Sequence, residues 1–276
     1  MGRSQSVVLG GAGRCFAAGI IACLAVSIVW PAQLPAADQA AVSKLVLSNK
    51  ILAMEGLVGP FGHVSVRSTR PGRFLIAKHE SADRVTAADI IEVEEQVTPA
   101  LARERDLYLE VFIHSTIYAQ YPDIKAVVHT HAPSATALGT LRTPNNRILP
   151  TTNPGANLGN FIPIFPEVGL VRDPDKGRRI AASLQGQNGV LLRGHGAVVV
   201  GNSLEQAVLR AIYLEFEARA QMLSRGAGEP LPYTSEESDL FKETRAIDHA
   251  WHYFEEKAGR YEDERRPQGG QSRARK

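Results

Sequence analysis

The chain has 276 residues, a formal net charge of +2, and 44% hydrophobic and 22% charged residues. These values are ordinary for a globular protein and exclude a disordered, collagen-like or coiled-coil chain. The nearly balanced charge argues against a dedicated nucleic-acid-binding protein, which would carry a strongly basic face. The two cysteines, Cys15 and Cys23, both lie near the N-terminus, so no disulfide framework or cysteine zinc site is expected beyond them.

In chain order, residues 1–37 come first and have the pattern of a secretory signal peptide. Arg3 and Arg14 precede an uncharged, apolar run over residues 15–30, and small residues follow as far as Ala37. The run is shorter than the roughly 20 apolar residues that a membrane span needs. We therefore expect export to the periplasm or the medium, with no stable membrane span after cleavage. An uncleaved anchor and a buried N-terminal helix are the alternatives.

The hydrophobic pattern of residues 38–258 predicts one α/β domain, in which the strands form a single sheet and helices pack around it. Helices are expected over residues 39–58, 108–121, 175–185, 203–224 and 235–257, and strands over residues 64–66, 74–76, 90–93, 125–131, 189–192 and 197–200. Residues 142–169 are rich in Pro, Asn and Gly and are expected to be mostly loop. The polar, basic residues 259–276 are expected to form a flexible tail.

Three histidines stand out by their position next to predicted strands. His129 and His131 are two residues apart at the end of one strand, so their side chains project from the same face. His195 lies between two glycines after another apolar strand, and glycine lets the backbone turn sharply there. Three imidazoles with an open position are a recurring catalytic metal arrangement. The spacing therefore predicts a metal site, although a lone histidine in a strand is more often a packed or surface residue than a ligand.

Glu110 and His114 are four residues apart on a predicted helix and are expected to share one face of it. In one interpretation, Glu110 enters the metal site as a ligand or as an acid/base residue. In the other, the pair faces solvent and contributes only a little to helix stability. Helical spacing does not choose between them.

Taken together, these motifs resemble those of the class II aldolase/adducin family, in the family's order and over roughly residues 40–225. The matching blocks are Gly62-His63-Val64-Ser65-Val66-Arg67, Glu110-x-x-x-His114, Ala126-Val127-Val128-His129-Thr130-His131, Arg193-Gly194-His195-Gly196 and Leu204-Glu205-x-Ala207. The resemblance implies a three-layer α/β/α fold around a central, mainly antiparallel sheet. It also implies a homotetramer with active sites between neighbouring subunits.

By the same resemblance, His129, His131 and His195 are expected to bind Zn²⁺ or Mn²⁺. Glu110 is expected to be the acid/base residue and a further metal ligand. The family's sugar-phosphate aldolases carry Asn where this chain has His63, and a Ser pair where Tyr108 and Leu109 precede the glutamate.

The motif Gly62-His63-Val64-Ser65-Val66-Arg67, together with Tyr108-Leu109-Glu110, is more similar to the branch that contains 3-hydroxy-2-methylpyridine-4,5-dicarboxylate decarboxylase and other aromatic-acid decarboxylases. That resemblance implies that His63, Ser65 and Arg219 bind substrate. For His63 the alternative is a hydrogen-bonded loop residue, and for Arg219 it is a solvated helix position.

The predicted function is that of a divalent-metal-dependent carbon–carbon lyase, either a decarboxylase or an aldolase (an aldehyde-lyase). Its substrate is expected to be a small oxygenated acid or carbonyl compound, cleaved through a metal-stabilised enolate. The metal acts as a Lewis acid on the developing negative charge, and Glu110 moves the proton. The alternative is a non-catalytic exported protein that binds a metal or a small molecule on the same fold.

Overall fold

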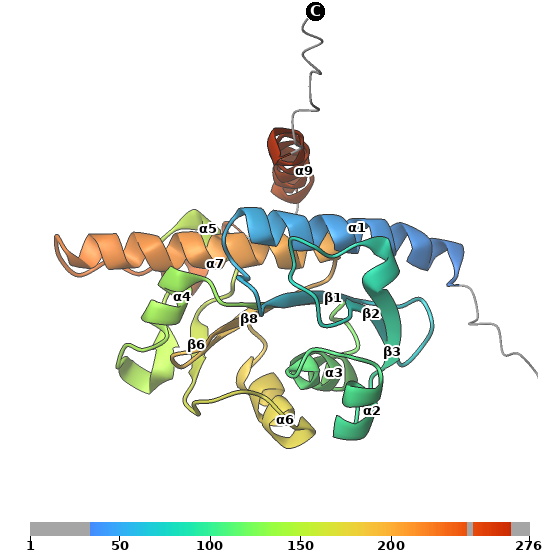
Figure 1. Cartoon of the computed structure of the whole chain (residues 1–276). Helices are drawn as coiled ribbons and strands as arrows, with labels where there is room; N and C mark the ends of the chain where they lie inside the picture. The colour runs from blue at the N-terminus through green and yellow to red at the C-terminus, as the bar shows by residue number, and fades with distance from the viewer. Residues whose placement is uncertain (1–33, 242–244, 266–276) are drawn as a thin grey trace, which may run out of the picture. The chain divides into compact units, whose positions relative to one another are not determined.

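A computed structural model describes residues 34–241 and 245–265 of the chain (Figure 1). The described residues form one compact unit. The predicted export segment falls almost entirely on residues 1–33, outside this range, and the first helix starts at Ala36. No helix within the described ranges combines the length and apolar character needed to cross a membrane.

Eight strands form one sheet in the order β3-β2-β1-β4-β8-β7-β6-β5. Neighbouring strands are antiparallel except β6 and β7, which run parallel. The sheet is therefore mostly antiparallel, as expected. The strands are β1 (His63–Arg67), β2 (Arg73–Ala77), β3 (Ile90–Glu94), β4 (Ala126–Thr130), β5 (Arg147–Ile148), β6 (Ile162–Phe165), β7 (Gly189–Leu192) and β8 (Gly196–Gly201).

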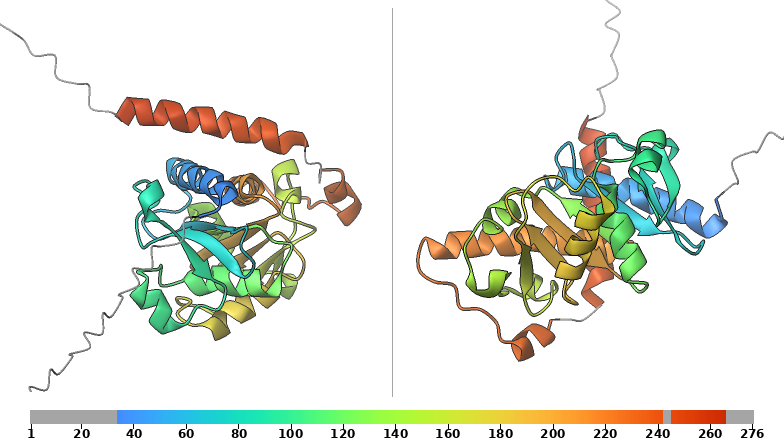
Figure 2. Two further views of the ribbon diagram at one scale, coloured as in Figure 1. Left: turned by 90° about the vertical axis from the view of Figure 1, so that its right-hand side faces the viewer. Right: turned by 90° about the horizontal axis from the view of Figure 1, so that it is seen from below.

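Helices cover both faces of this sheet, which gives the expected three layers. In Figures 1 and 2, α1 and α7 lie on one face, and α2, α3 and α6 lie on the other. The helices are α1 (Ala36–Met54), α2 (Pro99–Glu104), α3 (Val111–Gln120), α4 (Pro133–Leu138), α5 (Asn153–Ala156), α6 (Pro174–Ser183), α7 (Leu204–Arg225), α8 (Ser235–Asp239) and α9 (Arg245–Arg265). α9 packs on α1 and α7 through the buried Trp251, and Lys257 forms an ion pair of 2.6 Å with Glu55.

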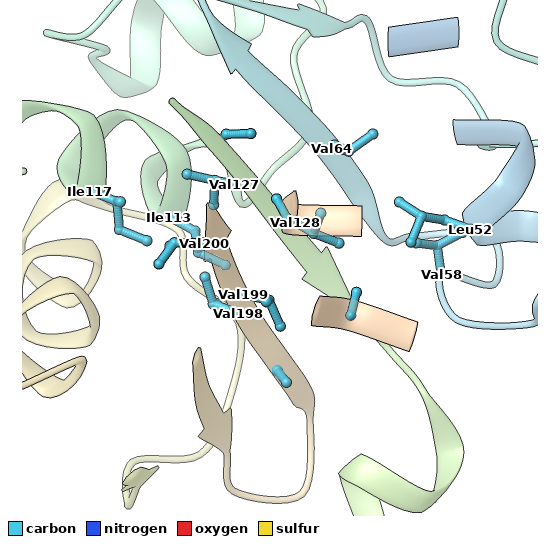
Figure 3. Packing of buried hydrophobic residues seen from close by; sticks show 14 of the residues in the cluster. Leu52, Val58, Val64, Ile113, Ile117, Val127, Val128, Val198, Val199 and Val200 are labelled. Carbon is cyan, nitrogen blue, oxygen red and sulfur yellow. The ribbon is translucent and has the colours of Figure 1, made fainter. Parts of the chain in front are cut away.

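The central strands β4 and β8 are buried along their whole length because helices cover both of their faces. Successive side chains of a strand point to opposite faces, so each strand contributes to both halves of the core. Figure 3 shows Ile113 and Ile117 of α3 on one side of β4, and Leu52 and Val58 on the other. Odd-numbered residues of β1 and β4 therefore face α3, and this placement decides where the polar residues of these strands lie.

Two parts of the fold differ from the sequence predictions. Residues 142–169 are mostly loop, as expected, but they also contain β5, α5 and the fully buried strand β6, which were not expected. Pro163 concealed β6, since proline argues against a strand within a sheet. The helix expected over residues 235–257 is two helices, and α9 continues to Arg265, beyond the expected start of the tail. Composition suggested a solvated tail there, but pairs of opposite charge four residues apart, such as Glu256 and Arg260, favour helix.

Candidate metal centre

The ends of β4 and β8 bring three histidines together. His129 is the last residue but one of β4, His131 follows the strand directly, and His195 lies in the turn between β7 and β8. The pairing of Thr130 with Ala197 places these strand ends side by side. The three ring centroids are 4.7 to 5.1 Å apart. Histidines that are more than 60 positions apart in the sequence thus share one site.

Two glycines permit this approach. Gly194 has a φ of +66°, in the left-handed region that residues with a side chain rarely adopt. A Cβ atom at Gly196 would lie 2.1 Å from the Thr130 carbonyl oxygen and 3.1 Å from Cδ2 of His131. The turn that presents His195 therefore requires both glycines, for two different physical reasons.

The donor atoms of the cluster point at one another. Nε2 of His131 lies 2.9 Å from Nε2 of His129. Oε2 of Glu110 lies 3.3 Å from Nε2 of His129 and 3.2 Å from Nε2 of His195. One donor atom from each of the four residues lies within 4.8 Å of all the others.

The hydrogen-bonding state of these atoms fits a divalent metal. Nδ1 of His129 lies 3.0 Å from the Ala197 carbonyl oxygen, which can only accept, so the ring carries its proton on Nδ1 and a lone pair on Nε2. Nε2 of His195 is buried and makes no hydrogen bond. Three imidazole nitrogens and a carboxylate are a ligand set that Zn²⁺ accepts and that Mn²⁺ also tolerates. His129, His131, His195 and Glu110 are therefore the residues that would hold the ion.

Glu110 is not inside a helix, which corrects the expectation from its spacing to His114. α3 begins at Val111, and Glu110 is the N-cap residue, with no capping hydrogen bond from its side chain. Its carboxylate instead turns to the histidine cluster, whereas His114 faces His63. The solvent-facing interpretation of the pair is wrong as well, since Glu110 is 6% exposed and His114 is fully buried.

A buried lysine supports the loop that holds the Glu110 carboxylate. The backbone N–H of Val171 donates to Oε1 of Glu110 at 2.7 Å. Just before it, the carbonyl oxygens of Val168 and Gly169 accept hydrogen bonds of 2.8 and 2.6 Å from Nζ of Lys176. Sequence reasoning missed both Val171 and Lys176. No motif marks them, because Val171 acts through its backbone amide and Lys176 bonds backbone carbonyl oxygens.

Burial and neighbouring groups set the protonation states in the cluster. Burial by itself would raise the pKa of Glu110, but the imidazoles of His129 and His195 beside the carboxylate outweigh it and hold that pKa well below its usual range. Burial lowers the pKa of His131 to about 4, and the nearby imidazoles act in the same direction. Near neutral pH the site thus holds a carboxylate and a neutral His131, the states that metal binding requires.

The other predicted site residues lie in two different places. His63 packs against His129, with ring centroids 5.1 Å apart, and is 1% exposed. Ser65 is fully buried, and its hydroxyl meets His114 and Tyr118. Arg219 lies on the exposed face of α7, and no hydrogen bond or ion pair among the described residues ties it to the cluster.

Comparison with known proteins identifies the fold and its family. Residues 43–222 match the model of the Class II Aldolase and Adducin N-terminal domain. The chain is 30% identical over 208 residues to a 3,4-dihydroxyphthalate decarboxylase from Arthrobacter keyseri, a match that covers 71% of this chain and 84% of the relative.

A second relative, from Streptomyces roseochromogenus subsp. oscitans, is named 4-hydroxy-3-prenylphenylpyruvate oxygenase/4-hydroxy-3-prenylbenzoate synthase. The chain is 32% identical to it over 152 residues, which are 54% of each protein, so the match spans about half of that relative's length. Among solved structures, the L-fuculose 1-phosphate aldolase from Glaciozyma antarctica PI12 superposes with a TM-score of 0.67 at 23% identity, over 84% of this chain and 94% of the aldolase. The fold, the histidine cluster and these matches agree with the resemblance seen in the sequence, and the chain belongs to the class II aldolase and adducin N-terminal domain family.

Proposed function

We propose that the protein is a divalent-metal-dependent carbon–carbon lyase of the decarboxylase type. Its substrate is a small aromatic acid with a hydroxyl group beside the carboxylate. The observation that carries the proposal is the meeting of His129, His131, His195 and Glu110 at one point, with their donor atoms within 4.8 Å of one another. When bound there, Zn²⁺ or Mn²⁺ supplies a Lewis acid that stabilises negative charge on the substrate oxygens.

Two observations favour decarboxylation over aldol cleavage. The relative that the chain matches over the larger part of its length is named as a decarboxylase of an aromatic dicarboxylic acid. In addition, His63 and the Tyr108-Leu109 pair replace the residues with which the family's sugar-phosphate aldolases bind phosphate. Both support an unphosphorylated acid as substrate.

Glu110 starts the reaction as a base, because its low pKa keeps it ionised at neutral pH. It accepts the proton of the substrate hydroxyl through Oε2, since the Val171 amide occupies Oε1, and the three histidines alone would then hold the ion. Glu110 returns this proton to the ring carbon that bears the carboxylate, and the hydroxyl oxygen becomes a carbonyl oxygen. The bond between that carbon and the carboxylate then breaks, CO₂ leaves, and the electron pair moves through the ring to this oxygen. The phenolate product takes up a proton from water on release.

The test measures CO₂ release by the full-length chain, loaded with Zn²⁺ or Mn²⁺, from 3,4-dihydroxyphthalate and related hydroxylated aromatic acids. Aldehyde release from L-fuculose 1-phosphate is measured in parallel. We expect metal-dependent CO₂ release that chelation abolishes and added metal restores. Aldehyde without CO₂ reassigns the protein as an aldolase, and bound metal without either product reassigns it as a non-catalytic binding protein.

Because one relative carries an oxygenase name, the assay is repeated without O₂. The proposed reaction breaks the bond heterolytically and neither gains nor loses electrons overall. Its rate is therefore expected to be equal with and without O₂. A rate that requires O₂ and consumes it in proportion to CO₂ excludes the proposed lyase.

We further propose a homo-oligomer, with a homotetramer as the expected state, whose subunits meet beside the metal centre. Phe61, Leu109, Val168 and Leu170 expose 43% to 63% of their surfaces. Phe61 lies next to His131, with ring centroids 6.4 Å apart, and Leu109 directly precedes the Glu110 carboxylate in the chain. Exposed apolar patches of this kind mark interaction sites. Analytical ultracentrifugation is expected to show an oligomer that Phe61→Asp dissociates, and a monomeric wild-type protein excludes it.

Export through residues 1–37 is the remaining part of the proposal, and it rests on the sequence pattern. Cell fractionation of the full-length chain, followed by mass spectrometry of its N-terminus, tests it. We expect the protein outside the cytoplasm and beginning near residue 38. An intact N-terminus on protein confined to the cytoplasm contradicts export.

A further inference from the structure

A chain of hydrogen bonds runs behind the metal centre through four buried side chains. Nδ1 of His63 lies 2.7 Å from Nε2 of His114, and Nδ1 of His114 lies 2.6 Å from Oγ of Ser65. The Ser65 hydroxyl in turn lies 2.8 Å from the hydroxyl of Tyr118. None of the four residues is more than 1% exposed. We call this set the histidine–tyrosine chain.

The histidine–tyrosine chain follows from two matching periodicities. His63 and Ser65 are two residues apart on β1 and share the face that looks toward α3. His114 and Tyr118 are four residues apart on α3 and share one face of the helix. Polar side chains on both faces thus meet in the interior, where each needs a partner because water is excluded.

The phenol of Tyr118 sets the direction in which protons are donated. Among the described residues, the Ser65 hydroxyl is the one group that lies within hydrogen-bonding distance of this buried hydroxyl, at 2.8 Å. Leaving a buried O–H without an acceptor is strongly unfavourable. Tyr118 therefore donates to Ser65, and Ser65 uses its own proton to donate to Nδ1 of His114.

The direction continues through both imidazoles. A neutral ring carries one proton, so His114, which accepts at Nδ1, carries its proton on Nε2 and donates it to Nδ1 of His63. His63, which also accepts at Nδ1, must then carry its own proton on Nε2. Every donor within the histidine–tyrosine chain finds an acceptor in this arrangement, and the reverse arrangement leaves the phenol proton unpaired.

We propose that Tyr118, Ser65 and His114 fix His63 as the tautomer protonated on Nε2, so that His63 offers a hydrogen-bond donor, and not a metal-binding lone pair, beside the metal centre. His63 pairs with His129 in the register of β1 and β4, and the two rings pack together. Since Nδ1 is turned to His114, the N–H at Nε2 lies on the other side of the ring. Tyr118, Ser65 and His114 are thus positioning residues that act through His63.

The identity of the group that meets this N–H rests on the proposed function. A hydroxylated aromatic acid presents carboxylate and carbonyl-like oxygens, which accept hydrogen bonds. A fixed donor favours such an acceptor and disfavours a substrate with a donor at the same place, because buried donors would then face each other. His63 therefore selects for a second acceptor oxygen on the substrate.

The tautomer is measured directly by ¹⁵N NMR of the full-length, histidine-labelled chain, with and without Zn²⁺. Protonated and bare ring nitrogens differ widely in chemical shift, and the His63→Gln spectrum assigns the resonance. We expect His63 and His114 both to be protonated on Nε2, with or without metal. Protonation of His63 on Nδ1 overturns the proposal. This measurement needs no turnover, so it stands apart from the fate of the lyase assignment.

Two variants test whether the histidine–tyrosine chain causes the tautomer. Ser65→Ala removes the donor to Nδ1 of His114, and we expect both tautomers of His63 to become populated. His114→Gln, whose amide both donates and accepts, is expected to do the same and serves if Ser65→Ala does not fold. The matched control is Ser115→Ala, a buried serine of α3 whose hydroxyl donates to the Phe112 carbonyl oxygen, and it is expected to leave the spectrum unchanged. A single Nε2-protonated His63 in the folded variants overturns the proposal.

Kinetics test the substrate contact. His63→Phe removes the donor and is expected to lower kcat/KM roughly 10- to 100-fold, mainly through KM, as expected for a lost hydrogen bond to a charged group. His63→Gln keeps an N–H donor and is expected to recover part of that loss. An unchanged kcat/KM in His63→Phe overturns the donor role. A wild-type protein without any turnover contradicts the proposed function instead and leaves the NMR result unaffected.

Discussion

Glu110 and Glu217 are two buried carboxylates of one fold, and their surroundings differ sharply. Both oxygens of Glu217 are occupied by neutral donors. Oε1 accepts from the backbone amide and hydroxyl of Thr151 at 2.8 and 2.9 Å and from the Gln221 amide at 2.7 Å, and Oε2 accepts from the Thr152 hydroxyl at 2.5 Å. These bonds tie α7 to the segment that leads into α5.

Only one oxygen of Glu110 is occupied in this way, by the backbone amide of Val171. The other faces the imidazoles of His129 and His195, whose Nε2 atoms have no partner besides the cluster itself. Burial is similar at the two sites, so burial alone does not distinguish a structural carboxylate from a reactive one. The difference lies in whether donors already fill the oxygens. Glu217 is expected to stabilise the fold, and Glu110 to serve the chemistry.

The largest effect is expected from Glu110→Gln. The amide can neither accept the substrate proton nor return it, so turnover is expected to fall about 10²- to 10⁴-fold. The metal-free protein is expected to lose less unfolding free energy than Glu217→Gln loses, because Oε2 of Glu110 accepts no hydrogen bond from an amide or hydroxyl among the described residues. CO₂ release and urea unfolding measure the two quantities. A variant that unfolds easily but retains its turnover would erase the contrast with Glu217.

His131→Ala tests whether the cluster of histidines around Glu110 is a metal site. Zn²⁺ at about 100 times its Kd should stabilise the wild-type protein by about 2.7 kcal/mol, since it binds only the folded state. His131→Ala is expected to abolish this stabilisation, and Glu217→Gln to retain it. Thermal unfolding with and without Zn²⁺, together with metal analysis, makes the measurement. Equal stabilisation of both variants would place the ion elsewhere.

Glu217→Gln is expected to have the opposite profile to Glu110→Gln. The amide group replaces one acceptor oxygen among four donors, so the unfolding free energy should fall by about 1–3 kcal/mol. Metal content and turnover of the folded fraction should remain near wild type. Loss of turnover at full stability would show that the segment from Thr151 to Ala156 also takes part in the reaction.

A smaller effect is expected from removing the lysine that supports the loop beside Glu110. Lys176→Met removes the ammonium group that holds the carbonyl oxygens before Val171, so the Glu110 carboxylate loses its alignment. We expect turnover to drop about tenfold, the usual size of such an outer contribution. Arg178→Met, on the exposed side of the same helix, is the matched control. Equal rates in the two variants would show that Val171 is positioned without the lysine.

The pH dependence of stability gives the smallest and most general test. Burial, and then His129, lower the pKa of His114 to about 3, whereas the unfolded chain has a value near 6.5. Between these values the unfolded state binds a proton that the folded state does not. Stability is therefore complete above about pH 6.5 and decreases as the pH falls toward 3.

Urea unfolding of the metal-free protein at pH 7 and pH 5 measures this loss. Part of the difference is expected to disappear in His114→Gln. His252→Ala, which changes an exposed histidine of α9, should keep the full difference. A wild-type protein that is equally stable at both values contradicts a buried neutral His114.

Local patterns predicted the ligands but not their support. The spacing of His129 and His131, and the glycines around His195, express strand geometry that is visible in a few neighbouring residues. The Val171 backbone amide contacts Glu110, and the Lys176 side chain contacts backbone carbonyls of the same loop, so no side-chain pattern records this support. Tyr118 was predicted only as part of the helix over residues 108–121, because its partner Ser65 lies 53 positions away in the sequence.

In the fold, too, the sequence predicted features set by neighbouring residues and missed features set by distant contacts. Strands such as β4 were found because their apolar residues are consecutive, and α7 because of its length and its N-cap at Ser203. β6 was missed because Pro163 interrupts a run of only four residues, and its place in the sheet depends on pairing with the distant β7. Likewise, Glu110 was assigned to a helix interior because capping depends on backbone angles that a carboxylate four residues before a histidine does not reveal.

Substitutions of Gly196 are expected to abolish metal binding although Gly196 is not a ligand. It has no atom to offer an ion, yet any larger residue there must push aside the Thr130 carbonyl and the His131 ring. A random-mutagenesis screen for zinc-deficient clones should therefore recover changes at position 196 as often as changes at the ligands themselves. The positions of such changes would therefore mark the contact between β4 and β8 as well as the metal ligands.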